Sequence, residues 1–124
     1  MSLRGLVMDY GGVITDGPGM TDLVRRARAA GRATALVSDA HTVPDGCAGL
    51  FDVLVLGPAL GVRKPDPEVF RRTAGLLGLR PGDCVVVDDL AVNVRGARAA
   101  GTVVVRHVDV ATTVAEVEIL LGLP

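Results

Sequence analysis

Short apolar runs and amphipathic stretches alternate along the whole chain. Five runs dominated by Val, Leu and Ala predict strands at residues 3–8, 33–37, 53–56, 84–87 and 102–105. Consecutive positions in these runs are apolar, which is typical of parallel strands that are covered on both faces. The pattern therefore predicts a parallel sheet of about five strands.

Helical periodicity and helix-end signals lie between these strands. Thr21 is a plausible N-cap for a helix that continues to residue 30. Asp66 as N-cap and Pro67 at the first helical position predict a second helix, which Gly78 ends. Further helices are predicted at residues 91–100 and 111–121, with short helical pieces inside 40–50 and 57–63.

The alternation of strands and helices defines the fold class. It predicts an α/β fold: a three-layer α/β/α Rossmann-like sandwich around the central parallel sheet. The chain has 124 residues and 49% of them are hydrophobic, enough for one domain over residues 1–124 with its own core. With one Tyr, two Phe and no Trp, that core must consist mainly of Val, Leu and Ala.

Charge and cysteine content exclude several classes of protein. A formal net charge of -1 carries no nucleic-acid signature and gives no reason to expect an anionic membrane surface as a partner. Two cysteines do not suggest a disulfide framework. The sequence shows no signal peptide and no apolar run of membrane-spanning length, so we expect a soluble, cytoplasmic protein.

Polar residues follow three of the predicted strands. Asp9, Ser38 and the pair Asp88 and Asp89 each stand where an apolar run ends. Each has an ordinary explanation alone, as a strand-end turn or a helix cap, although a cap requires only one Asp. Together they are more informative, because the carboxyl ends of parallel strands lie at one edge of the sheet. Lys64, the only lysine of the chain, lies in a loop that returns toward this edge.

This set of groups suits the binding of a phosphoryl group together with Mg²⁺. Two adjacent carboxylates repel each other at a buried strand end, and a cation relieves the repulsion. The lysine would pair with carboxylate and phosphate, and the Ser38 hydroxyl would hold a phosphate oxygen. Asp9 is the candidate nucleophile, forming an aspartyl-phosphate intermediate.

Four segments of the chain, in order, resemble the motifs of the haloacid dehalogenase-like (HAD) hydrolase superfamily. They are residues 6–13 (LVMDYGGV), 36–38 (LVS), 61–70 (GVRKPDPEVF) and 86–93 (VVDDLAVN). The resemblance covers roughly residues 4–107. It implies a Mg²⁺-dependent hydrolase, a phosphomonoester phosphatase in the first instance, acting on a phosphorylated small molecule or macromolecule. It implies the following roles: Asp9 and Lys64 catalytic; Ser38, Asp39 and Gly12 substrate-binding; Asp9, Gly11 through its carbonyl, Asp88 and Asp89 metal ligands; Asn93 supporting the loop.

One position departs from the pattern of the superfamily. Its phosphatases usually carry a second Asp two residues after the nucleophile, as general acid and base, and this chain has Gly11 there. Dehalogenases usually have Tyr at that position, but Tyr10 is one residue earlier and would point to the opposite side of the strand. Asp16 and His41 are the candidates for a replacement acid. A loss of acid–base catalysis costs about 10²–10⁴-fold in rate, so we expect weak activity.

The second departure is the absence of a cap domain. The segments 10–37 and 39–63, where relatives insert caps, are too short to contain one. The resemblance then implies an open site that a macromolecular substrate or a neighbouring subunit covers. We therefore predict a homo-oligomer or a bulky substrate.

Two other functions remain in view. A non-catalytic binding or regulatory module would keep the fold and the metal, and Gly11 favours it. A phospho-acceptor receiver domain has a similar length and similar residues. Receivers, however, carry their acidic pair on the first strand, whereas this chain has Asp88 and Asp89 on the fourth.

Overall fold

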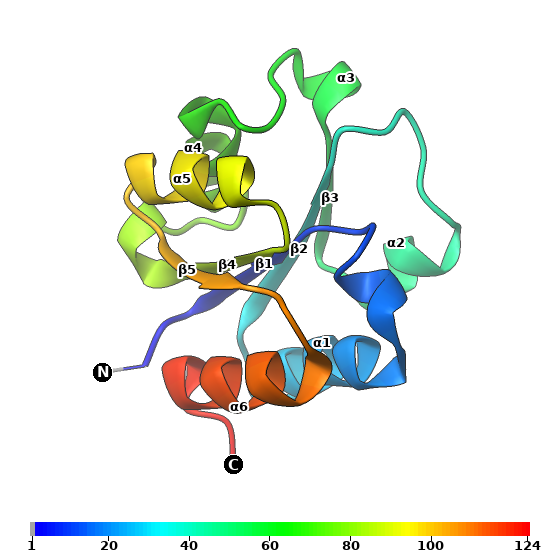
Figure 1. Cartoon of the computed structure of the whole chain (residues 1–124), viewed down its shortest axis with the longest axis vertical. Coiled ribbons are helices and arrows are strands. Elements are labelled where there is room, and N and C mark those ends of the chain that lie inside the picture. The colour runs from blue at the N-terminus through cyan, green and yellow to red at the C-terminus, as the bar shows by residue number, and fades with distance from the viewer. Residues whose placement is uncertain (1) are drawn as a thin grey trace.

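The computed structural model describes residues 2–124 (Figure 1). The strands are β1 (Gly5–Met8), β2 (Ala33–Ser38), β3 (Val53–Leu56), β4 (Cys84–Asp88) and β5 (Val103–Arg106). The helices are α1 (Pro18–Ala29), α2 (Gly46–Leu50), α3 (Gly57–Leu60), α4 (Pro67–Leu76), α5 (Ala91–Ala99) and α6 (Val110–Leu121). Two 3₁₀ turns, η1 (Ile14–Asp16) and η2 (Pro81–Asp83), complete the order of elements.

The five strands form one parallel sheet in the order β3-β2-β1-β4-β5. β1 is central, and all four of its residues are buried. The chain therefore reverses its direction of travel across the sheet between β3 and β4, which leaves β1 and β4 as neighbours. Ligands of open α/β sheets bind outside the carboxyl ends of the strands at such a switch point. The predicted α/β fold with a five-stranded parallel sheet is confirmed.

Helices cover both faces of the sheet, as Figure 1 shows, with α1 and α6 on one face and α4 and α5 on the other. Alternate residues of each strand point to opposite faces, so the core has two parts. The part beneath α1 and α6 includes Leu6, Met8, Leu23, Val24, Leu36, Val85, Val87, Val105, Val117 and Leu121. The part beneath α4 and α5 includes Val7, Ala35, Val37, Val55, Val69, Phe70, Ala74, Val86 and Ala97.

The start of one helix agrees with the prediction from the sequence, whereas the starts of another helix and of the first strand differ from it. The Asp66 carboxylate accepts a hydrogen bond from the Glu68 N–H, so α4 has the predicted N-cap. The predicted N-cap Thr21 is wrong: α1 begins at Pro18, and the Thr21 hydroxyl donates to the Pro18 carbonyl inside the first turn. β1 also begins later than predicted, at Gly5, and the Leu3 N–H donates to the Leu120 carbonyl of α6 rather than to a neighbouring strand.

The two segments in which relatives insert a cap domain form helices and strands of the three-layer sandwich. Residues 10–37 contain η1, α1 and most of β2, and residues 39–63 contain α2, β3 and α3. Neither segment contains a domain outside the three layers. Among the helices of residues 2–124, none is both long and apolar enough to cross a lipid bilayer.

Candidate active site

β1 delivers Asp9 to the carboxyl edge of the sheet. The strand pairs with β2 on one side and β4 on the other, and the Asp9 N–H continues this pairing by donating to the Val87 carbonyl at 3.1 Å. Both neighbouring strands restrain the backbone at this point, so the position of the Asp9 Cα, from which the carboxylate extends, is fixed. Its side chain is 13% exposed, so one end of the group faces solvent.

Lys64 crosses from its loop to the end of β1. Its ammonium lies 2.6 Å from Asp9 Oδ1 and 3.2 Å from Asp88 Oδ2, and its side chain is only 5% exposed. We call Asp9, Lys64 and Asp88 the ion triad. A buried ammonium shared by two buried carboxylates is costly to desolvate, and such a cluster is weak evidence for stability but is typical of functional sites.

The backbone around Lys64 is held on both sides. Its N–H donates to Asp39 Oδ1 at 3.0 Å, which connects the loop to the end of β2. On the other side, the loop lies against α5, where a Cβ at Gly96 would collide with the Pro65 carbonyl. Only glycine at position 96 allows this approach. The lysine is therefore aimed by packing and hydrogen bonding of its own segment.

Asp88 is the most constrained member of the ion triad, at 1% exposure. Its carboxylate accepts hydrogen bonds from the Leu90 N–H and, through both oxygens, from the Asn93 side-chain amide. The amide of Asn93, expected from the sequence to support this loop, thus holds the carboxylate itself. Hydrogen bonds of this kind fix its orientation.

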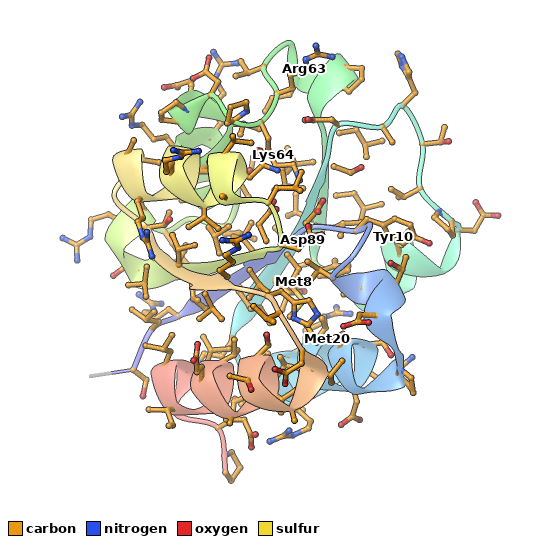
Figure 2. All side chains as sticks on the ribbon, in the orientation of Figure 1. Met8, Tyr10, Met20, Arg63, Lys64 and Asp89 are labelled. Atoms are coloured by element: carbon orange, nitrogen blue, oxygen red, sulfur yellow. The ribbon has the colours of Figure 1, made fainter. Side chains whose placement is uncertain are left out.

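Asp89 completes a cluster of three carboxylates. One carboxylate oxygen from each of Asp9, Asp88 and Asp89 lies within 4.8 Å of the others. Figure 2 shows Lys64 and Asp89 near the end of β1, with Tyr10 farther along the loop. Three converging hard oxygen donors are the ligand type that Mg²⁺ and Ca²⁺ prefer. The residues therefore fit a divalent cation chemically.

Burial and charge act against each other within the ion triad. Burial raises the pKa of Asp9 above 3.8 and Asp88 adds to the rise, whereas the Lys64 ammonium opposes it. Burial alone would lower the pKa of Lys64, but the Asp9 and Asp88 carboxylates outweigh it and raise this pKa above 10.5. Lys64 is thus a cation at neutral pH.

The loop after β1 carries two glycines with different roles. Gly12 has a positive φ of 78°, and a Cβ there would collide with the Asp89 carboxylate. Gly11 has neither constraint: its φ is not positive, and a Cβ would meet nothing within 4 Å. The backbone therefore requires glycine at position 12 but not at position 11. Tyr10, two residues beyond the end of β1, packs against the core beneath α1 and α6, which is the opposite side from the ion triad, as the sequence predicts.

Ser38 and Asp39 flank the ion triad at the end of β2. The Ser38 hydroxyl oxygen accepts a hydrogen bond from the Ala40 N–H at 3.2 Å, so its proton is available to a ligand. Asp39, expected from the sequence to bind substrate, uses one carboxylate oxygen to hold the Lys64 backbone. This supporting contact was not anticipated, because it joins two loops that no sequence pattern relates.

Neither candidate replacement acid forms a hydrogen bond or an ion pair with the ion triad among residues 2–124. Asp16, in η1, has its carboxylate 2.7 Å from His107 Nε2, while His107 Nδ1 lies 2.7 Å from the Thr113 hydroxyl on α6. We call Asp16, His107 and Thr113 the histidine chain. His41 instead lines an open groove of about 410 Å³ beside the loop that leads to Lys64. The sequence offered no signal for the histidine chain, since Asp16 and His107 are 91 positions apart.

The fold and the site define a parallel α/β domain with a lysine-bridged carboxylate centre at its switch point. The model of the haloacid dehalogenase-like hydrolase family matches residues 12–101. The chain therefore belongs to the haloacid dehalogenase-like hydrolase family.

Curated relatives are much longer than this chain. Acyl-CoA dehydrogenase family member 10 of Mus musculus is 33% identical over 113 residues, which cover 86% of this chain and 11% of that protein. N-acylneuraminate-9-phosphatase of Mus musculus is 41% identical over 56 residues, covering 44% of this chain and 23% of that protein. The match in each case is to a minor part of the relative.

Solved structures share the fold. An uncharacterized protein from Corynebacterium glutamicum has a TM-score of 0.89 and 33% identity, with 99% of this chain and 98% of that chain covered. A HAD family enzyme from Bacteroides thetaiotaomicron, crystallised with magnesium and inorganic phosphate, has a TM-score of 0.58 and 20% identity, with 68% and 50% covered. The first match extends over essentially the whole of both chains, so this chain and its Corynebacterium relative have the same architecture.

Proposed function

We propose that this chain is a Mg²⁺-dependent phosphomonoester hydrolase that works through an aspartyl-phosphate on Asp9. The observation that carries the proposal is the contact between the Asp9 carboxylate and the Lys64 ammonium, 2.6 Å apart, beside two further carboxylates. The phosphatase name of one curated relative supports the same reaction class.

The metal site of the proposal consists of Asp9, Asp88 and Asp89, with the Gly11 carbonyl as a further ligand. These are oxygen donors, which suit Mg²⁺. When bound, Mg²⁺ would offset the charge between the carboxylates and an incoming phosphoryl group. The magnesium and phosphate of the Bacteroides enzyme lie in a protein of the same fold, which supports this choice of ion.

Asp9 acts as the nucleophile in the first step. One of its carboxylate oxygens forms a bond to phosphorus as the bond between phosphorus and the ester oxygen breaks. Lys64 and the Ser38 hydroxyl donate to the phosphoryl oxygens, where charge is spread in the transition state. The departing alkoxide takes a proton from water, because position 11 supplies no acid.

Water completes the reaction. It attacks the phosphorus of the acyl phosphate and loses a proton to solvent, which releases inorganic phosphate and restores Asp9 as a carboxylate. In this step too, the chain lacks a base at position 11. A positioned acid and base contributes about 10²–10⁴-fold, so turnover is slow by that factor.

Gly11 also favours a second candidate function, a binding or regulatory module that keeps the metal and phosphate site without turnover. Position 11 accommodates a side chain in this backbone, since a Cβ there meets nothing within 4 Å. The missing acid is thus not explained by the space or the backbone conformation at Gly11. A measurement of phosphate-ester hydrolysis is needed to distinguish a slow enzyme from a binding module.

The test compares hydrolysis of a generic phosphate ester, with and without Mg²⁺, by wild type, Asp9→Asn and Gly11→Asp. We expect slow Mg²⁺-dependent hydrolysis by wild type and its loss in Asp9→Asn. Gly11→Asp should be faster by about 10²–10⁴-fold, since it supplies the acid without backbone strain. Gly46→Asp is the matched control, because Gly46 also has an open surrounding and ordinary φ but lies on α2.

Thermal unfolding with Mg²⁺ and inorganic phosphate separates the two functions. A ligand that binds the folded state raises stability by mass action. Stabilisation without hydrolysis in either wild type or Gly11→Asp would favour the binding module. If the protein showed no stabilisation and no hydrolysis, the proposed metal and phosphate site would be contradicted altogether.

A further inference from the structure

An arginine-lined groove of about 390 Å³ lies between α5 and β5, beside the candidate active site. Its walls are Ala91, Val94, Arg95 and Arg98 of α5, and Arg106 at the end of β5. The four helix positions follow one face at spacings of three and four residues. Val104 packs toward α4 and α5, so Arg106, two residues farther along the strand, is on that same face. We call Arg95, Arg98 and Arg106 the arginine groove.

The three guanidinium groups of the arginine groove have no carboxylate partner. Among residues 2–124, five other arginines form ion pairs with Asp or Glu, but Arg95, Arg98 and Arg106 form neither an ion pair nor a side-chain hydrogen bond. All three residues are exposed. Like charges at helical spacing repel, so the free groove carries an unfavourable interaction that an anion would relieve.

The arginine groove adjoins the ion triad through the sheet and through the chain. In the register of β4 and β5, Arg106 is directly opposite Asp88, one interstrand spacing away, or about 5 Å between Cα atoms. Ala91 follows the metal-ligand candidate Asp89 by two positions. Figure 1 shows that α5 begins at the carboxyl end of β4, and the parallel strand β5 finishes at that same end. Asp9 follows β1, two strand spacings from β5, or roughly 10 Å, and a ligand with two phosphoryl groups can bridge this span.

Within residues 2–124, substrate selectivity must come from the surface around the ion triad rather than from a cap. The segments 10–37 and 39–63 contain no cap that could contact the substrate. The remaining surface around the ion triad must supply recognition. Guanidinium groups match phosphate in geometry through paired N–H donors, and three of them converge on one groove.

We propose that the arginine groove binds a second anionic group of the substrate, so that the preferred substrates carry two phosphoryl groups. This rests on the proposed function: one phosphoryl group reacts at Asp9 while the other is held by Arg95, Arg98 and Arg106. The groove contributes binding energy remote from the reacting bond, which raises kcat/KM for a bisphosphate over a monophosphate.

The first test compares a hexose bisphosphate with the corresponding hexose monophosphate as substrates. Wild type should prefer the bisphosphate in kcat/KM by roughly 10-fold or more, since hydrogen bonds to charged groups are each worth about one to two powers of ten. Arg98→Gln should lower this ratio severalfold, and the Arg95→Gln, Arg98→Gln, Arg106→Gln triple variant should bring it near one. The loss should come mainly from KM for the bisphosphate.

Arg25→Gln is the matched control. Arg25 is exposed on α1, on the opposite face of the sheet, and forms no ion pair among the described residues. Its substitution removes one positive charge from the molecule without touching the arginine groove, so the ratio should stay as in wild type. An equal fall of the ratio in Arg25→Gln would overturn the proposal in favour of a general charge effect.

A second test does not depend on turnover. Inorganic phosphate is titrated into the metal-free protein, in which the three carboxylates repel it, and backbone amide shifts are followed by NMR. We expect saturable shifts at residues 91–98 and 106 that the triple variant loses. Such shifts in a protein that hydrolyses neither ester would support the groove and contradict the proposed function alone. Hydrolysis without preference, together with no shift in the groove, would overturn the inference and leave the proposed function standing.

Discussion

The two ends of the loop after β1 are held by polar clusters of opposite character. At its start, Asp9 belongs to the ion triad, where the ammonium and both carboxylates are largely buried. At its end, Asp16 belongs to the histidine chain, in which the carboxylate is 45% exposed and the imidazole is buried. The first cluster lies toward α4 and α5 with Asn93, and the second contacts α6 through Thr113.

The difference favours a functional role for the ion triad and a structural role for the histidine chain. A buried cluster of three charges is costly, and apolar residues of similar volume would often be equally stable. The ion triad is therefore best explained by what it can bind. The histidine chain satisfies both ring nitrogens through a hydroxyl and a carboxylate, which ties η1 to α6 and the end of β5. The His107 N–H also donates to the Asp88 carbonyl at 2.9 Å, and we predict that these contacts position the loop rather than take part in the chemistry.

Replacing Lys64 should give the largest effect on stability. In Lys64→Met, the Asp9 and Asp88 carboxylates remain buried without a cation, and removal of one partner of a buried pair typically costs about 3–5 kcal/mol. Urea unfolding at pH 7 with a chelator present measures the loss. Arg63→Met is the control, because Arg63 is exposed and adjacent in the chain. Equal stability of the two variants would contradict the view that the ion triad is tightly coupled.

A smaller effect is expected at the histidine chain. His107→Leu leaves the buried Thr113 hydroxyl without its partner and frees the Asp16 carboxylate, which should cost about 1–3 kcal/mol of unfolding free energy. His41→Leu, at an exposed position, should change stability by about 0.5 kcal/mol or less.

Activity decides whether the two clusters are truly different in kind. We expect Asp16→Asn and His107→Leu to retain phosphate-ester hydrolysis within about tenfold of wild type, unlike Asp9→Asn. Loss of hydrolysis in Asp16→Asn as complete as in Asp9→Asn would move Asp16 into the catalytic set, as a replacement acid.

The features that could be predicted from the sequence are those that depend on local residue patterns or on the common edge of parallel strands. Apolar runs gave β1 and β4, the Asp66-Pro67 pair gave the start of α4, and the common edge of parallel strands brought Asp9 and Asp88 together. The start of α1 was wrong because Gly17 and Pro18 provide an earlier start, which the capping preference of Thr21 obscured.

Contacts between distant loops could not be predicted in the same way. The bond from the Lys64 N–H to Asp39 and the pair of Asp16 with His107 depend on how loops pack. The arginine groove was within reach of the sequence: Arg95 and Arg98 share a helix face, and strand alternation places Arg106 toward that helix. Recognising it required the order of the strands, which puts β5 beside β4.

The smallest predicted effect concerns alkaline pH. The two carboxylates raise the pKa of Lys64 in the folded state above 10.5, outweighing the opposite effect of burial. Above pH 10.5 the unfolded chain loses this proton first, so the folded state binds more protons and the free energy of unfolding falls as pH rises. The stabilisation is fully present below pH 10.5 and is lost as pH passes through the folded pKa, at a slope of up to about 1.4 kcal/mol per pH unit.

Comparing variants isolates this contribution, because other groups that titrate at high pH are common to all of them. Urea unfolding of metal-free protein between about pH 9.5 and 11.5 should show a steeper fall for wild type than for Lys64→Met. His107→Leu should keep the steep fall, since the histidine chain makes no contact with Lys64. Identical slopes in wild type and Lys64→Met would mean that the ammonium gains nothing from its two carboxylates, and the ion triad would then differ from the histidine chain in position only.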